Sequence, residues 1–406
     1  MLRRIPSASP LSEGPDQGHA AEEATQEAAA VWGLPDFVYR QSVVQLRGGI
    51  RELGDGIVIV GDTAMVLQVK RRTVPSGRTD RESSWILKNS EQALSQAAGT
   101  IRRLRREPAM LRSLRGRSIE IAGSDYRWIS IVIVDHDEPP RDVVVPLTAE
   151  QPAVVMLRRD WEFLFEQLKS TSAVVGYCGR VAGEAHALGL EPTRYYELAL
   201  ADRDAQNEEI DPRLVVRGQP IISSPTLPLA PAAFADADAH AMVRSVFEDI
   251  ALTRLTKATE EQMLQVLAEL DRLPVSSRAV VGEFLIDAIG EAITSTDERT
   301  VWRYRSLRGN QGQAHLAYGA CNKPLDEEIQ RAFELWVQLR HHEVVTVTGD
   351  IENLTTVGVL LTPRDDKERP WDTTVCAVKG DLGYSARDIE LLRELWPRPE
   401  EMPTAP

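Results

Sequence analysis

The amino-acid sequence predicts an α/β protein: an N-terminal mixed sheet flanked by helices, followed by a C-terminal α+β domain. The chain has 406 residues, which is more than one hydrophobic core usually holds. Its composition, 43% apolar and 27% charged, is typical of a globular protein. In the first half, helical patterns alternate with strand patterns, and this order favours a sheet covered by helices.

The domain boundaries follow from composition. Residues 1–19 are rich in Ser, Pro and Gly, so we expect a disordered lead there. Residues 205–239 contain five prolines and no hydrophobic period, and this indicates a linker. We therefore predict domains over 20–204 and 240–395, with a tail over 396–406. The sequence does not indicate the role of the second domain.

The first domain is expected to begin with a helix. Residues 20–32 are rich in Ala and Glu, and Gly33-Leu34-Pro35 ends this helix. Apolar runs on both sides of Gly61-Asp62 predict a β-hairpin over 57–70. The remaining patterns predict an extended segment over 37–46, a polar loop over 71–88, a helix from Asn89 or Ser90 to Glu107, strands over 128–134 and 143–145, and helices over 160–168 and 177–188.

The second domain combines amphipathic patterns with short β-branched runs. The amphipathic patterns predict helices over 241–255, 260–273, 281–294 and 325–339. The apolar runs predict strands over 300–305, 314–318, 343–347 and 357–361.

The sequence predicts a cytoplasmic protein without a membrane segment. No stretch approaches the roughly 18–20 apolar residues that a membrane-spanning helix needs. The N-terminus lacks the apolar segment of a secretory signal. The three cysteines, Cys178, Cys321 and Cys376, are far apart and fit a reducing compartment.

Polar residues stand at one end of the predicted hairpin. If Gly61-Asp62 is a two-residue turn, Val60 faces Thr63, and Asp55 falls opposite Gln68. Alternation along a strand places Gln68 and Lys70 on one face. A cross-strand pair points the same way, so we expect Asp55, Gln68 and Lys70 to converge.

This trio has two interpretations. In the structural one, Asp55 and Lys70 form an ion pair, and Gln68 bonds to both. In the chemical one, the oxygens of Asp55 and Gln68 hold Mg²⁺, which prefers hard oxygen ligands. Lys70 then orients the attacking water or stabilises the negative charge of a phosphorane-like transition state.

Positive charge is concentrated beside the trio. The chain has a formal net charge of −14, yet the window from Lys70 to Arg117 has thirteen basic and four acidic residues. A phosphate backbone would favour this placement, although a solvated Arg-rich helix surface would give the same pattern. The arginines predicted to contact DNA are Arg71, Arg72, Arg102, Arg103 and Arg106.

The hairpin resembles the core motif of the PD-(D/E)xK nuclease superfamily. That motif is an acidic residue, a short strand, and then acid-x-Lys on the next strand. Here it corresponds to GDGIVIV over 54–60 and VLQVK over 66–70. Within this superfamily the sequence resembles nuclease-related and Mrr-type restriction endonuclease domains, in which glutamine sometimes replaces the second acid. An amide adds no negative charge to a metal site, so Asp55 is the one acidic ligand of this motif.

The resemblance covers about residues 20–190 and implies a restriction-endonuclease-like fold with Mg²⁺ or Mn²⁺ as cofactor. It implies Asp55 and Gln68 as metal ligands and Lys70 as a catalytic residue. Similar domains have a tryptophan and then an Asn-led helix, here Trp85 and the helix from Asn89, which places Gln96 near the site. Similar domains also supply a glutamate from their first helix, and Glu23 and Glu27 are the two candidates.

Two functions from different classes follow. The first is a metal-dependent DNA phosphodiesterase of endonuclease type, acting in bacterial DNA defence or genome maintenance. The second is an inactive nuclease-fold module that binds nucleic acid or a protein partner. An acidic interaction scaffold is a third interpretation. In each case the C-terminal domain would regulate, recognise a target or form a homo-oligomer.

Overall fold

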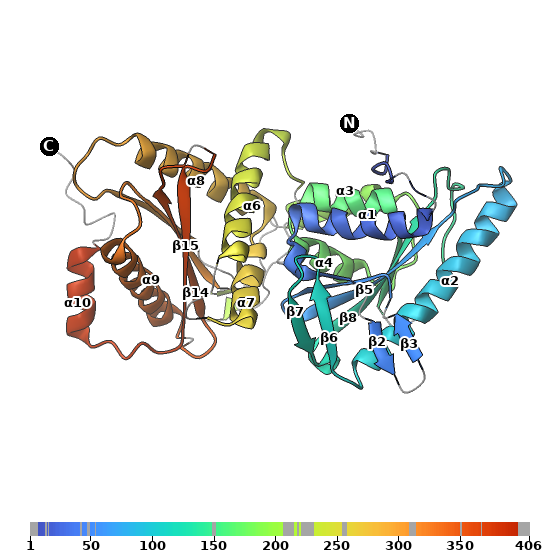
Figure 1. Ribbon diagram of the computed structural model, residues 1–406, viewed down its shortest axis with the longest axis horizontal. Coiled ribbons are helices and arrows are strands. Elements are labelled where there is room, and N and C mark those ends of the chain that lie inside the picture. The colour runs from blue at the N-terminus through green and yellow to red at the C-terminus, as the bar shows by residue number, and fades with distance from the viewer. Residues whose placement is uncertain are drawn as a thin grey trace. The chain divides into compact units, whose positions relative to one another are not determined.

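The structure is a computed structural model in which the chain forms two compact units (Figure 1). Unit 1 comprises Met1–Phe234 with Asp271–Ser276, and unit 2 comprises Ala235–Leu270 with Ser277–Pro406. The structure describes all residues except 1–6, 13, 15, 41–42, 47–48, 53, 148–151, 206–214, 217–218, 221–230, 254–257, 308–313, 350, 367 and 397–406. The predicted α/β class is confirmed, because each unit combines a sheet with helices.

Unit 1 is built on a seven-stranded mixed sheet of order β7-β6-β1-β4-β5-β8-β9. The neighbours from β7 to β5 are antiparallel, whereas β5, β8 and β9 run parallel. The strands are β1 (Val38–Arg40), β4 (Gly56–Val60), β5 (Thr63–Arg71), β6 (Ala109–Ser113), β7 (Ser118–Ile121), β8 (Arg127–Asp135) and β9 (Ala153–Leu157). Because β5, β8 and β9 run parallel, their carboxyl ends meet at one edge of the sheet.

Helices cover both faces of this sheet (Figure 1). They are α1 (Gln17–Trp32), α2 (Thr79–Leu104), α3 (Arg158–Leu168), α4 (Thr171–Val181) and α5 (Glu191–Ala205). Ala97 and Ile101 of α2 pack in one apolar cluster with Val66 of β5. Helix α1 lies on the face of the sheet opposite α2, the face to which Leu67 points. A Cβ added at Gly56 on this face would lie 3.3 Å from Leu67 Cδ1 and 3.5 Å from Cγ of Gln26 in α1. The short elements are β2 (Val43–Leu46) with β3 (Gly49–Glu52), β10 (Val215–Val216) with β11 (Gln219–Pro220), and the 3₁₀ turns Pro35–Phe37, Gly123–Asp125 and Phe234–Asp236.

Three predicted elements of unit 1 need correction. Helix α2 begins at Thr79 rather than Asn89 or Ser90, because the buried Glu82 ties its first turn to the preceding loop. The predicted strand over 143–145 contributes only an isolated bridge at Val144, and β9 forms the edge of the sheet instead. The predicted helix over 177–188 is α4, which ends at Val181.

The predicted disordered lead is also corrected for its described part. Ser9 donates hydrogen bonds from its amide and hydroxyl to Glu162 of α3, at 2.7 and 2.9 Å, and accepts one from Arg158. Helix α1 begins at Gln17, and the side chain of Asp16 accepts a hydrogen bond from the amide of His19. Most of the predicted linker, over 206–214 and 221–230, lies outside the described residues, as does the tail after Trp396.

Unit 2 contains a four-stranded sheet of order β12-β13-β14-β15. The parallel pair β13 and β14 is joined through α9, whose Phe333, Trp336 and Val337 pack with Ala317 and Leu360 of the sheet. The elements are α6 (Ala237–Leu252), α7 (Glu260–Asp271), α8 (Val275–Thr294), β12 (Trp302–Leu307), β13 (His315–Cys321), α9 (Glu327–Thr348), β14 (Thr355–Pro363), β15 (Trp371–Lys379) and α10 (Ala386–Leu395).

The predicted strand over 343–347 is wrong. These residues continue α9 until Gly349, which takes a left-handed conformation with φ of 73°. The β-branched residues there have a strand propensity, but tertiary contacts override it. The imidazole of His341 bonds to the hydroxyl of Thr356 and to the carbonyl of Gly380, each at 2.9 Å, and holds the helix against the sheet.

Gly358 of β14 is a sensitive packing position under α9. A Cβ there would overlap Val337 Cγ2 and lie 3.1 Å from Phe333 Cζ. We expect Gly358→Ala to lower the free energy of unfolding by about 1–3 kcal/mol, because core side chains must shift. Gly290→Ala is the matched control, since a Cβ there has nothing within 4 Å and alanine favours the helix. Urea unfolding followed by tryptophan fluorescence measures both, and equal effects would contradict the packing argument.

Candidate functional site

The register of the β4–β5 hairpin is the predicted one. Val60 pairs with Thr63, and the pairing continues without a slip to Gly56 and Leu67. A slip of one residue would have moved the polar residues to opposite faces. The hairpin therefore places Gln68 and Lys70 on the face of β5 that α2 covers.

Asp55 stands just before β4, and its pairing differs from the prediction. It does not continue the ladder opposite Gln68, because its amide donates to the carbonyl of Leu67 at 3.1 Å. Gly54, with φ of 90°, turns the chain at this point. The Asp55 Oδ2 accepts a hydrogen bond of 2.6 Å from the amide of Val69. The carboxylate thus lies against β5 at the residue between Gln68 and Lys70.

The other two members of the trio differ in exposure. The side chain of Gln68 is buried, and the residue is 3% exposed. Lys70 is half-buried, and its Nζ donates to Oε1 of Gln96 on α2 at 3.0 Å. Gln96 therefore lies beside the trio, and it orients the amine of Lys70.

Helix α1 contributes Gln26 to the site instead of a glutamate. The Nε2 of Gln26 donates to the carbonyl oxygen of Asp55 at 2.6 Å. Glu23 is exposed and pairs with His19 at 3.3 Å, and Glu27 is also exposed. Gln26 lies in the buried stripe of α1 with Thr25 and Ala29, a helical spacing that could have identified it from the sequence.

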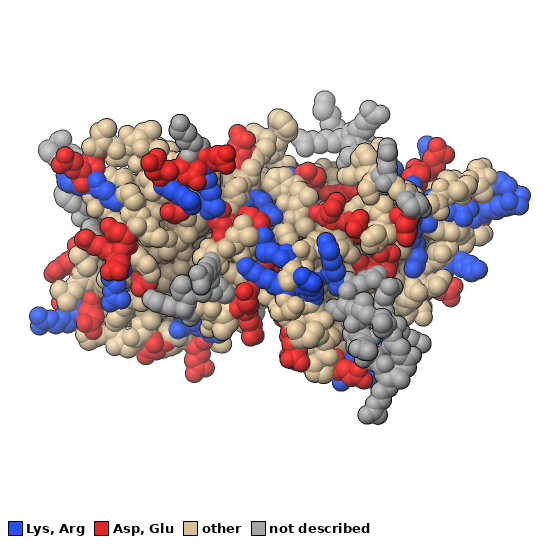
Figure 2. All heavy atoms as spheres, in the orientation of Figure 1, with Lys and Arg blue, Asp and Glu red and all other residues tan. Residues whose placement is uncertain are grey.

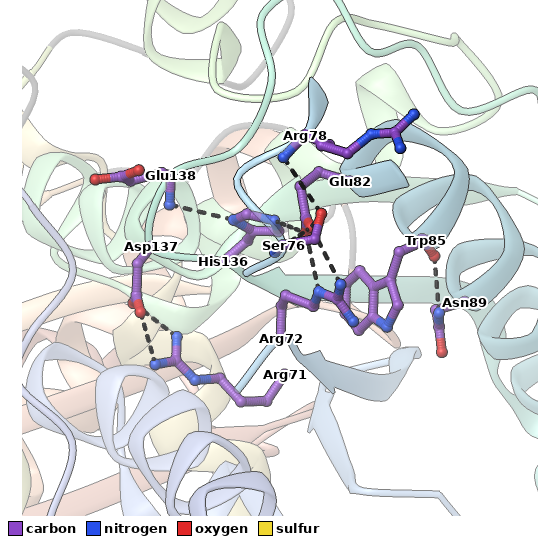
Figure 3. Close-up of polar contacts among 10 residues, drawn as sticks. All are labelled: Arg71, Arg72, Ser76, Arg78, Glu82, Trp85, Asn89, His136, Asp137 and Glu138. Atoms are coloured by element: carbon purple, nitrogen blue, oxygen red, sulfur yellow. Dashed lines mark hydrogen bonds and ion pairs between the residues drawn. The ribbon is translucent and has the colours of Figure 1, made fainter. Parts of the chain in front are cut away.

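Two of the predicted DNA-contacting arginines are engaged with carboxylates (Figure 3). Arg71 pairs with Asp135 at 3.2 Å and with Asp137 at 2.8 Å. Arg72 pairs with Glu82 at 2.9 Å. These ion pairs offset the positive charge that a phosphate would need, so Arg71 and Arg72 are weak candidates for DNA contact.

The remaining predicted arginines lie in the last turns of α2 and just beyond it. Arg102 and Arg106 are exposed, and Arg103 is half-buried. Figure 2 shows further Lys and Arg side chains at the other end of the helix, around the tip where the β5–α2 connection lies. Basic side chains therefore stand at both ends of the helix that carries Gln96.

A buried polar cluster centred on Glu82 was missed by the sequence analysis (Figure 3). The carboxylate of Glu82 accepts hydrogen bonds from Arg72, from the amide and hydroxyl of Ser76, and from His136. These hydrogen bonds, that of Arg72 first, hold the pKa of Glu82 far below its usual range. The Nδ1 of His136 accepts from the amide of Glu138, so Nε2 carries the proton that is donated to Glu82. The cluster fixes the start of α2 to the end of β8.

The comparisons with protein-family models, curated proteins and solved structures each found no match to this chain. Among the described residues, no group of three or more His, Cys, Asp or Glu side chains is arranged to hold a metal ion. None of the described helices is both long and apolar enough to cross a membrane.

Proposed function

We propose that unit 1 is a metal-dependent phosphodiesterase that acts on DNA, in bacterial DNA defence or genome maintenance. The observation that supports this most is the position of Asp55, whose carboxylate lies against β5 between Gln68 and Lys70. In this proposal the acid, the amide and the amine act together at one end of an apolar sheet face. Their order along the chain also matches the nuclease motif that the hairpin resembles.

The donor set fits Mg²⁺ or Mn²⁺. Carboxylate and amide oxygens are hard ligands, and Mg²⁺ usually takes one or two protein carboxylates and keeps several waters. Asp55 Oδ2 accepts a hydrogen bond from the amide of Val69, and Gln68, which precedes Val69 on β5, would be the second ligand. When bound, the ion would supply Lewis-acid polarisation of the scissile phosphate.

Lys70 supplies the cation of the site. Its amine is held by Gln96 on the polar end of the sheet face, where it would stabilise negative charge that develops on the phosphate. The guanidiniums of Arg102 and Arg106, which are exposed on and just after α2, would contact the DNA backbone. Backbone contacts of this kind bind without regard to base sequence.

A binding module without catalysis is the second candidate function. It is favoured by the lack, among the described residues, of three acidic or imidazole ligands around one point. In this alternative the fold and the basic end of α2 are retained, and the chemistry is lost with the second acid of the motif.

Gln68→Glu distinguishes the two candidates. It restores a second carboxylate, so we expect the Mg²⁺ concentration for half-maximal plasmid cleavage to fall about tenfold or more. Without metal, the buried charge should lower the melting temperature, and Mg²⁺ should restore it. Plasmid cleavage and thermal unfolding, each titrated with Mg²⁺ and Mn²⁺, measure these effects.

Gln338→Glu is the control, because Gln338 is a half-buried amide of unit 2 whose Oε1 accepts a hydrogen bond from the hydroxyl of Tyr384. Any change that it makes in the melting temperature should not depend on Mg²⁺ or Mn²⁺. If neither wild type nor Gln68→Glu cuts DNA with either ion, while both bind it, the enzyme proposal is wrong and the binding module stands.

A further inference from the structure

A hollow of unit 1 runs beside α2, and Asp55, Gln68 and Lys70 are not among its lining residues. It has a volume of about 760 Å³, within the usual size range of small-molecule sites. One wall is formed by Leu87 and Leu94 of α2, and the other by Val145 and Leu147 of the chain before β9. These walls are aliphatic, and the described residues of the lining include no aromatic side chain.

The lining of this groove includes a buried hydroxyl that has no hydrogen-bond partner among the described residues. Ser130 of β8 is 1% exposed, and its Oγ bonds to no group in the described part of the chain. A buried hydroxyl that lacks a partner costs about 1–3 kcal/mol, so its presence calls for a bound group. Ser130 Oγ can donate to an acceptor that enters the groove.

The charges along the groove are asymmetric. Glu91 lies toward one end, whereas Arg102 and Arg105 lie about 16–21 Å further along α2, from the rise per residue of a helix. Both arginines are exposed, and neither pairs with a carboxylate in the described part of the chain. The end with the arginines therefore attracts an anion, and the end with Glu91 repels it.

We propose that this groove binds an amphiphilic acid: a small molecule with an aliphatic body and one anionic head group. The body would lie between the leucine and valine walls, where burial of apolar surface supplies affinity. The head group would accept hydrogen bonds from Arg102, Arg105 and Ser130. A nucleobase fits less well, because protein sites for unpaired bases stack them on aromatic rings.

Octanoate and octan-1-ol test this proposal, since they share a chain and differ in the head group. Isothermal titration calorimetry with the full-length protein should show one octanoate per chain, bound more tightly than octan-1-ol. The double substitution Arg102→Gln with Arg105→Gln should weaken octanoate at least about tenfold, because charge-assisted hydrogen bonds are lost. Octan-1-ol binding should be unchanged in the same variant.

Two further variants keep the result specific to the groove. Ser130→Ala should weaken octanoate about tenfold. Arg106→Gln, an equally exposed arginine outside the lining, should leave octanoate binding unchanged. The proposal is overturned if octanoate does not bind, if octan-1-ol binds equally well, or if Arg106→Gln has the effect of the double substitution. Arg102 is also proposed to contact DNA, but octanoate binding is measured without DNA, so these outcomes are independent of DNA cleavage.

Discussion

Lys70→Ala should lower the rate of Mg²⁺-dependent plasmid cleavage at least about 100-fold, which corresponds to about 2.7 kcal/mol of barrier. The reason is that Nζ of Lys70 is the cation that Gln96 orients at the polar end of the sheet face. Asp55→Ala should have an effect of the same size, because it removes the one carboxylate of the motif. Single-turnover cleavage at saturating metal measures both variants.

The controls separate catalysis from folding. Lys88→Ala removes an exposed lysine of the same helix that carries Gln96, and its cleavage rate should equal that of wild type. Lys70→Ala and Asp55→Ala should keep their melting temperatures within a few degrees. If both variants lose stability to a similar extent, Asp55 and Lys70 instead form a structural pair. If both cut DNA as wild type does, the proposed site is wrong.

Local signals predicted the hairpin and its register. The two-residue turn at Gly61-Asp62 fixes the pairing of β4 with β5, and one buried face prevents slippage. Alternation along β5 placed Gln68 and Lys70 on one face, and the register determined which residues of β4 share that face. The sequence alone could not place Asp55 correctly, because the positive φ of Gly54 takes the chain out of the ladder before Asp55 can pair.

The remaining errors come from contacts between residues that are distant in sequence. The polar residues before Asn89 predicted a loop. In the structure the helix begins at Thr79, and Glu82 of its first turn is buried against Arg72 and His136. The prediction from the net charge of the Lys70–Arg117 window likewise assumed that every arginine is available to bind a phosphate. In the structure Arg71 forms ion pairs with Asp135 and Asp137, and no local pattern in the sequence predicts this pairing.

The largest effect on stability is expected at Asp36. Its carboxylate is fully buried and accepts hydrogen bonds from Arg115 Nε at 2.7 Å and from Arg117 Nη1 at 3.2 Å. Both arginines lie in the turn between β6 and β7, so Asp36 ties this hairpin to the start of β1. The amide of Leu114 adds a hydrogen bond of 2.8 Å to the carbonyl of Val38.

Asp36→Ala should lower the free energy of unfolding by about 3–5 kcal/mol, because two partly buried guanidiniums lose their counter-charge. Asp80→Ala is the matched control: it removes an equally short ion pair, 2.7 Å to Arg78, in which both side chains are more than half exposed. An exposed pair is worth about 0.2–1 kcal/mol, so the control should change stability little. Urea unfolding at two salt concentrations measures both variants, because urea is uncharged and does not itself screen the ion pairs. Salt should reduce the small effect of Asp80→Ala and leave most of the effect of Asp36→Ala, since burial shields that pair from screening ions. A cost for Asp36→Ala no larger than that of the control would show that burial does not strengthen this ion pair.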